Sequence, residues 1–197
     1  MAFILLSCSG YNGDVADELS GGYTFRAEGS SSYIMADNGF KEEIYENILA
    51  YTFNKEFILI KQQPSFEKYK RRLASTLNSK ASSFANIDSS FFSESDVRLV
   101  KSQLSKDSTF YKYIIKNIST KNTNKDHLFC LKIADSILKY DPYYLDIFSR
   151  EINYWIISHR ESTTIEYVLF SKIYGPFSKD EFNKKKAQLG VQQELKL

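Results

Sequence analysis

The residue with the most specific chemistry in this sequence is a cysteine near its beginning. Cys8 follows a short apolar stretch in the order Leu5-Leu6-Ser7-Cys8. This order is typical of a bacterial lipobox, whose cysteine thiol is diacylated. Complete signal peptides also have a basic segment and an apolar core of about 7–15 residues, and both are short or missing here. Two interpretations follow: a lipidated Cys8 in a chain whose true start lies upstream, or an ordinary thiol on a buried first strand.

The other metal-ligating or nucleophilic side chains are few and widely spaced. His127 follows an aspartate at a predicted helix start, and His159 falls in a predicted hairpin loop, so we interpret both as surface or cap histidines. Two cysteines and two histidines at these spacings do not predict a zinc site. We interpret Cys130 as a small apolar residue of a helix. A disulfide between Cys130 and an unlipidated Cys8 stays open.

Motifs of the common enzyme classes are missing from the sequence. It contains no HExxH zinc motif, nucleophile elbow, P-loop or Gly-rich dinucleotide turn. We therefore predict no catalytic residues, no metal and no cofactor, and favour a non-enzymatic protein. An enzyme with a site assembled from scattered Ser, Asp and His residues is a further alternative, which predicts a deep pocket with a strongly shifted titratable group.

The C-terminal stretch gives the clearest structural signals. Strands are predicted at 153–158 and 165–170, where aromatic and β-branched residues are frequent, with a polar loop at 159–164. Ser178 and Glu181 have the spacing of a capping box, which predicts a helix over 179–189. Gly190 then stands where a left-handed residue ends a helix.

The rest of the chain divides into N-terminal strands and a helical middle. Strands are predicted at 23–28, 33–36, 48–53 and 56–62, with the last two joined by the two residues Asn54-Lys55. Helical spacing begins at Ser65, and the predicted helices are those starting at 65, 95, 107, 126 and 142, with a loop at 78–93. The predicted fold is α+β: an antiparallel sheet built from N- and C-terminal strands, with a helical segment inserted at about 65–150. Residues 1–20 are predicted to be a signal remnant with a flexible tether, and 21–197 a single domain.

Short motifs at the two ends of the chain resemble a family of uncharacterised bacterial lipoproteins, a domain of unknown function. They are Cys8, the Leu19-Ser20-Gly21-Gly22-Tyr23 strand, and the YGPF hairpin-helix of 174–177 and the residues after it. The resemblance covers roughly 8–63 and 152–191. It implies a lipid-anchored envelope protein and no particular activity.

The same YGPF segment is similar, more weakly, to the bend of GYF-type adaptor domains, which bind proline-rich peptides. That similarity makes Tyr174, Pro176 and Phe177 weak candidates for a binding site. The structural alternative is that glycine permits an unusual backbone angle and that proline fixes the next one.

Charge is distributed unevenly, although the net charge of the 197 residues is only +2. Residues 1–64 contain four Lys/Arg and nine Asp/Glu, whereas 65–150 contain fifteen and nine. The two regions are expected to attract each other within the fold, and the basic segment also offers a surface for an anionic partner. No specific nucleic-acid binding is expected.

These observations favour a non-enzymatic lipoprotein of the bacterial cell envelope, periplasmic or surface-exposed, which acts by binding or assembly. Its partner would be another envelope component, and Cys8 would provide the membrane contact. The alternative is a cytoplasmic interaction protein whose N-terminus is a buried strand.

Overall fold

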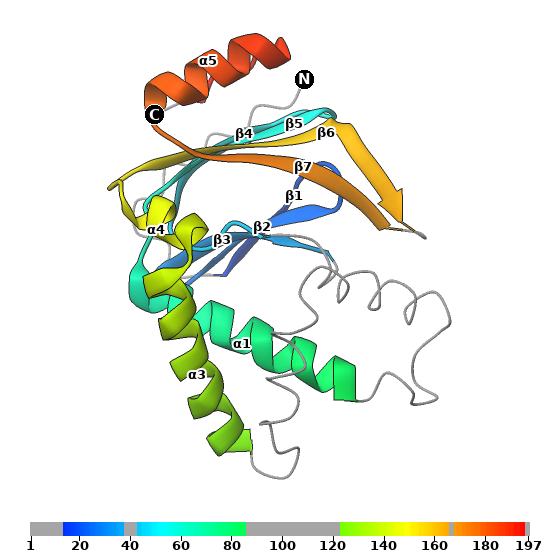
Figure 1. The fold of residues 1–197 in the computed structure, drawn as a ribbon. Coiled ribbons are helices and arrows are strands. Elements are labelled where there is room, and N and C mark those ends of the chain that lie inside the picture. Colours follow the sequence, from blue (N-terminus) through cyan, green and yellow to red (C-terminus); the bar gives the residue numbers. More distant parts are fainter. Residues whose placement is uncertain (1–13, 38–42, 86–122, 166–167, 196–197) are drawn as a thin grey trace.

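The computed structural model describes residues 14–37, 43–85, 123–165 and 168–195, and it confirms an α+β fold built from both ends of the chain (Figure 1). Sheet A contains the antiparallel strands β1 (Val15–Glu18), β2 (Tyr23–Glu28) and β3 (Ser31–Ala36), in that order. Sheet B has the order β4-β5-β6-β7 and contains β4 (Ile48–Phe53), β5 (Phe57–Gln62), β6 (Asn153–Ile165) and β7 (Val168–Phe177). The described helices are α1 (Phe66–Ala85), α3 (Thr123–Tyr140), α4 (Pro142–Phe148) and α5 (Lys179–Leu189).

Sheet B is the middle layer of the molecule, with α5 on one face and sheet A on the other (Figure 1). Successive side chains of a strand point to opposite faces, so β6 contributes to two cores. Trp155 and Ile157 belong to the large core, which sheet A, α1, α3 and α4 complete. Tyr154 and Ile156 belong to a smaller core beneath α5, together with Phe182. The pairing of β5 with β6 joins chain segments that are nearly a hundred residues apart.

The C-terminal helix has the predicted boundaries and caps. Ser178 Oγ accepts a hydrogen bond from Glu181 N, and the Glu181 carboxylate accepts one from Ser178 N at 2.8 Å. The two reciprocal bonds form the capping box and satisfy two N-terminal amide groups of the helix. Gly190 ends α5 in the left-handed region, with φ +68°. The short helix α4 begins as predicted, with Asp141 as its N-cap and Pro142 in its first turn.

Residues 15–18, which lie within the predicted tether, form strand β1. This strand pairs with β2 from Val15 to Glu18, and the Tyr51 hydroxyl on β4 donates a hydrogen bond to Asp17. Its acidic residues and lack of apolar alternation made it resemble a tether. Charged residues are common on short edge strands, where they discourage pairing with other chains.

Other predicted boundaries are wrong as well, and the strand predicted at 165–170 is β7, which begins at Val168 and continues to Phe177. Residues 159–164, predicted as a loop, belong to β6, and β6 and β7 are joined at residues 166–167, outside the described part. Helix α3 begins at Thr123, so Asp126 is a buried residue of its first turn and not its cap. Helix α1 continues to Ala85 through part of the predicted loop.

The connection between β4 and β5 contains one residue more than predicted. Asn54, at its start, accepts hydrogen bonds from the backbone N–H groups of Glu56 and Phe57, at 2.8 and 2.9 Å. An asparagine that bonds to the backbone of the following residues forms a turn without requiring the two-residue loop of a tight hairpin. The helices predicted to start at 95 and 107 lie outside the described residues, as does Cys8.

Candidate functional site

A half-buried histidine on β6 links the two sheets. His159 Nε2 lies 2.9 Å from the hydroxyl of Ser20, in the turn between β1 and β2, and its Nδ1 lies 2.6 Å from the hydroxyl of Ser171 on β7. The Tyr23 ring stacks on the imidazole, with 6.2 Å between the ring centroids. The prediction that His159 is a surface or cap histidine is therefore wrong. The signal that was missed is the length of β6, which continues past Ser158 to Ile165 and places His159 within a strand, where its backbone N–H donates to the Glu56 carbonyl oxygen.

Gly21, which follows Ser20, has no side chain, and the His159 ring occupies the space that a side chain would fill. A Cβ atom at Gly21 would lie 2.3 Å from Cε1 of the imidazole, and the residue has φ +66°. A side chain here would meet the ring and would also strain the backbone, so the close approach requires glycine. Gly21 and Tyr23 thus belong to the surface that contacts His159.

The second glycine motif contacts the same strand four residues earlier. A Cβ atom at Gly175 would lie 2.8 Å from Cε3 of Trp155 and 2.8 Å from the carbonyl oxygen of Tyr154, and Gly175 has φ +128°. Both end motifs of the chain therefore bring a glycine backbone against a ring on β6. In these two motifs the glycines are needed for packing.

A buried hydrogen-bond network extends from Trp155. Its indole N–H donates to Gln62 Oε1 at 2.8 Å, and the Gln62 amide donates to the Tyr69 hydroxyl and to the Tyr45 carbonyl oxygen. Burial raises the pKa of Tyr69 well above its ordinary value, and the bond with Gln62 opposes this rise. Because its polar groups are satisfied, this network holds β5, β6 and α1 in one arrangement.

The weak binding candidates of the YGPF segment are mostly covered. Pro176 is buried, and Phe177 packs against the core beneath α5. Tyr174 is half-buried and donates a hydrogen bond to Glu161, and Lys185 lies over its ring at 4.2 Å from the centroid. Burial and the bond to Glu161 raise the pKa of Tyr174, while the same bond lowers the pKa of Glu161. Of the three candidates, Pro176 therefore offers no surface to a peptide.

Exposed apolar side chains gather where α3 meets α4, at a bend that we call the elbow (residues 139–146). Tyr140 is 77% exposed, Leu145 is 50% exposed and Tyr143 is 47% exposed. Isolated exposed apolar residues are ordinary on proteins, but three within six positions, two of them tyrosines, form the kind of surface that partners bind. The sequence did not predict this surface, because helical periodicity alone does not show which side chains a neighbouring element covers.

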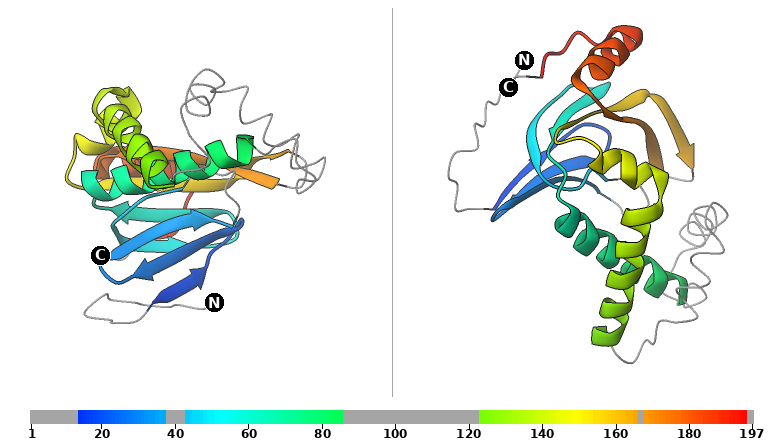
Figure 2. Two further views of the ribbon diagram at one scale, coloured as in Figure 1. Left: turned by 90° about the horizontal axis from the view of Figure 1, so that it is seen from below. Right: turned by 60° about the vertical axis from the view of Figure 1, so that its left-hand side comes forward.

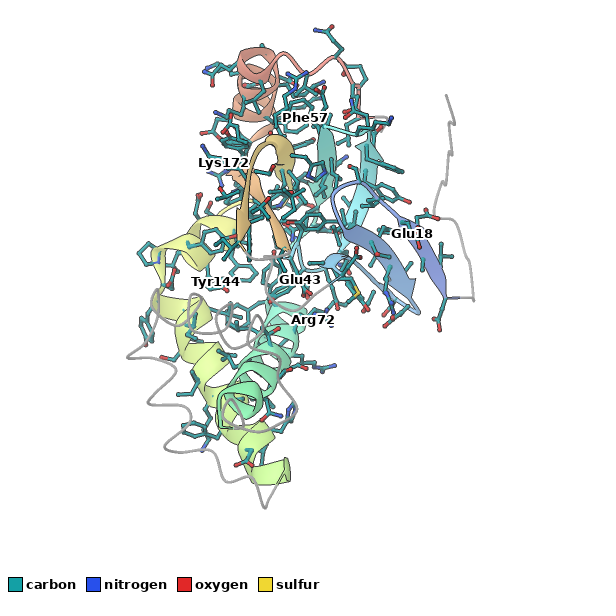
Figure 3. The ribbon with its side chains drawn as sticks, turned by 90° about the vertical axis from the view of Figure 1, so that its right-hand side faces the viewer. Glu18, Glu43, Phe57, Arg72, Tyr144 and Lys172 are labelled. Atoms are coloured by element: carbon teal, nitrogen blue, oxygen red, sulfur yellow. The ribbon has the colours of Figure 1, made fainter. Side chains whose placement is uncertain are left out.

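Ion pairs connect the acidic N-terminal region with the basic middle. Arg72 of α1 pairs with Glu43 at 3.1 Å and lies over the Tyr33 ring, as Figure 3 shows for the labelled Arg72 and Glu43. Lys68 of α1 lies 3.4 Å from a carboxylate oxygen of Glu46. The expected attraction between the two regions is therefore present in the described part. Binding of the basic segment to an anionic partner stays a prediction.

The remaining candidate residues, His127 and Cys130, form no metal or catalytic site within the described ranges. His127 is exposed on α3, whereas Cys130 is a fully buried free thiol in the large core, and burial raises its pKa. In the described ranges no group of three or more His, Cys, Asp or Glu side chains is arranged to hold a metal ion. Within those ranges, too, no helix is long and apolar enough to span a membrane.

Comparison with known proteins gives no relatives: no family model matches the chain, and neither a curated protein nor a solved structure matches it. The resemblance to envelope lipoproteins therefore stays a prediction.

Proposed function

We propose that this protein is a lipid-anchored protein of the bacterial cell envelope, attached through Cys8, that acts by binding or assembling with another envelope component. The lipobox order of residues 5–8 supports the anchor. A diacylated cysteine provides two acyl chains, enough for stable attachment, whereas a single chain gives only marginal binding.

The observation that carries the binding function is the placement of the elbow relative to the start of the described chain. Strand β1, which follows the anchor segment, lies at one side of the molecule, and α3 and α4 lie at the opposite side (Figure 2). The elbow between α3 and α4 therefore lies on the side of the molecule opposite β1, the first described strand after the proposed anchor. Aromatic side chains of this kind supply much of the binding energy in protein interfaces.

The anchor is tested by expressing the gene from its native locus, with the upstream DNA intact. We expect a mature protein whose mass corresponds to diacylated Cys8 and which partitions into the detergent phase. The control is Cys8→Ser, which should remain unmodified and in the aqueous phase. A wild-type chain that starts at residue 1 or 2, carries no lipid and stays soluble would contradict the proposal. It would favour the cytoplasmic interaction protein in its place.

The binding surface is tested separately, in cells, with a photo-reactive phenylalanine analogue. We expect crosslinks to one defined envelope partner from position Tyr140 and none from Asn183, which is exposed on α5. The double variant Tyr140→Ser, Leu145→Ser should abolish co-purification with that partner while leaving the fold intact. Equal crosslinking from both positions would contradict a binding surface at the elbow.

A further inference from the structure

The hydrogen bonds of His159 have the geometry of a general base next to a nucleophile. Ser20 Oγ lies 2.9 Å from Nε2, within the range of about 2.6–3.2 Å over which a base removes a proton. Ser171 Oγ lies 2.6 Å from Nδ1, the position at which a third group orients the imidazole in nucleophilic sites. The three side chains come from the β1–β2 turn, β6 and β7, so only the folded protein brings them together.

The imidazole is held in place before any substrate arrives. The Gly21 backbone lies against the ring so closely that a Cβ atom would be 2.3 Å from it, and Tyr23 stacks on the ring. A base whose orientation is fixed by packing needs little rearrangement during reaction. His159 and both serines are also half-buried, so they are shielded from bulk water without being sealed off.

We propose that Ser20 is a nucleophile, activated by His159 and oriented through Ser171, that accepts acyl groups from carboxylic esters. The Ser20 hydroxyl oxygen attacks the ester carbonyl carbon as its proton moves to Nε2, while Nδ1–H donates to Ser171. The tetrahedral intermediate then expels the alkoxide, which takes the proton back from Nε2 and leaves as an alcohol. The product is an ester of Ser20, which water hydrolyses by the same proton transfers in a second cycle.

Ser20 is favoured over Ser171 as the nucleophile because of its place in the chain. It lies in a turn and is followed by two glycines with positive φ, so no side chain of the next two residues obstructs an approaching carbonyl. Ser171 lies in strand β7, where the register with β6 shifts, and both of its neighbours, Phe170 and Lys172, carry large side chains. In the sheet, Phe53 pairs with Ile58 of the large core, so its ring lies on the same face of sheet B as His159, and it is 43% exposed. An exposed aromatic ring on this face suits an apolar acyl group.

This activity goes beyond the proposed binding function, because the site lies between the sheets and uses no residue of the elbow. It also does not depend on the anchor. A failure of the lipidation test would leave it untouched, and its own failure would leave the lipoprotein proposal untouched.

The test is reaction of the full chain with an alkyl fluorophosphonate, which phosphonylates activated serines, followed by peptide mass spectrometry. We expect one adduct, on Ser20, with none on Ser149, an exposed serine whose hydroxyl bonds to Asp146 and to no histidine among the described residues. Absence of an adduct on Ser20 of the wild-type protein would overturn the proposal, whatever the variants do. An adduct on Ser171 in place of Ser20 would overturn the assignment of the nucleophile.

Variants then distinguish activation of Ser20 by His159 from a purely structural role of His159. His159→Gln should lower the labelling rate at Ser20 by 100-fold or more, since a general base contributes about 10²–10⁴-fold. Ser171→Ala should lower it less, and Ser171→Thr, which keeps the hydroxyl, should restore it. The fluorescence of Trp155, the single tryptophan, reports whether each variant is folded. Labelling that is unchanged in a folded His159→Gln protein would mean that His159 only joins the sheets.

Discussion

The two ends of the chain pack closely against each other, whereas the helical segment between them exposes apolar side chains to solvent. The end segments meet on β6, where Gly21 lies against His159 and Gly175 against Trp155. The elbow of α3 and α4 instead leaves tyrosines and a leucine in contact with solvent. Glycines with positive φ therefore allow close packing against β6, whereas side chains at the junction of α3 and α4 provide the exposed apolar surface. The glycines of the two end motifs belong to the first group, so they inform the fold.

The largest effect is expected at Gly175, where the scaffold has no space. Gly175→Ala places a Cβ atom 2.8 Å from the Trp155 ring at φ +128°, which should cost about 3 kcal/mol or more of the free energy of unfolding. The matched control is Gly190→Ala, at φ +68° with open space around it, which should cost about 1 kcal/mol. Urea unfolding, monitored by Trp155 fluorescence, measures the loss of stability in both variants. Equal losses would show that the packing against Trp155 is unimportant.

Two residues of α4 that are two positions apart allow a direct comparison of the core with the elbow. Ile147 is 1% exposed and Leu145 is 50% exposed. Ile147→Ala should therefore destabilise the protein by about 2–5 kcal/mol, and Leu145→Ala by less than about 0.5 kcal/mol. Thermal or urea unfolding gives both values. A large loss in Leu145→Ala would mean that the elbow is part of the core and not a free surface.

The buried network predicts an effect of intermediate size. Trp155→Phe removes the N–H that satisfies Gln62 Oε1, and a buried acceptor without a donor costs about 1–3 kcal/mol. Unfolding must be followed by circular dichroism, because the variant lacks tryptophan. A double variant Trp155→Phe, Gln62→Leu should lose more stability than Trp155→Phe, because the Tyr69 hydroxyl and the Tyr45 carbonyl then lose their donor as well. No further loss would show that the network adds nothing beyond the packing of the indole ring.

The smallest effect is expected from the exposed capping box of α5. The hydrogen bonds from Ser178 lower the pKa of Glu181 below its ordinary value. The stabilisation is therefore fully present above the pKa of the unfolded chain and is lost as the pH falls through the lower pKa of the folded protein. Glu181→Gln should reduce the dependence of stability on pH in the acid range below about 4.3. Asp180→Asn, outside the capping box, is the control and should change this dependence less.

The sequence predicted those parts of the fold that have local signals. The capping box, Gly190 and Pro142 defined α5 and the start of α4, alternating side chains defined β2, and the short connection after Phe53 indicated the hairpin of β4 and β5. It did not predict β1, which has charged residues and gains its place only by pairing with β2, nor the true length of β6. The contact of Ser20 with His159 was also missed, because it depends on how the two sheets pack, and no local pattern encodes that.

The measurement that tests the scaffold most directly is the folding of a chain that ends at Arg150. This truncation removes β6, β7 and α5, and with them Trp155 and the partner of β5. We expect the fragment to have no near-ultraviolet circular dichroism signal and no cooperative unfolding transition. A fragment that unfolds cooperatively and retains a native near-ultraviolet spectrum would contradict the claim that both ends of the chain build one scaffold.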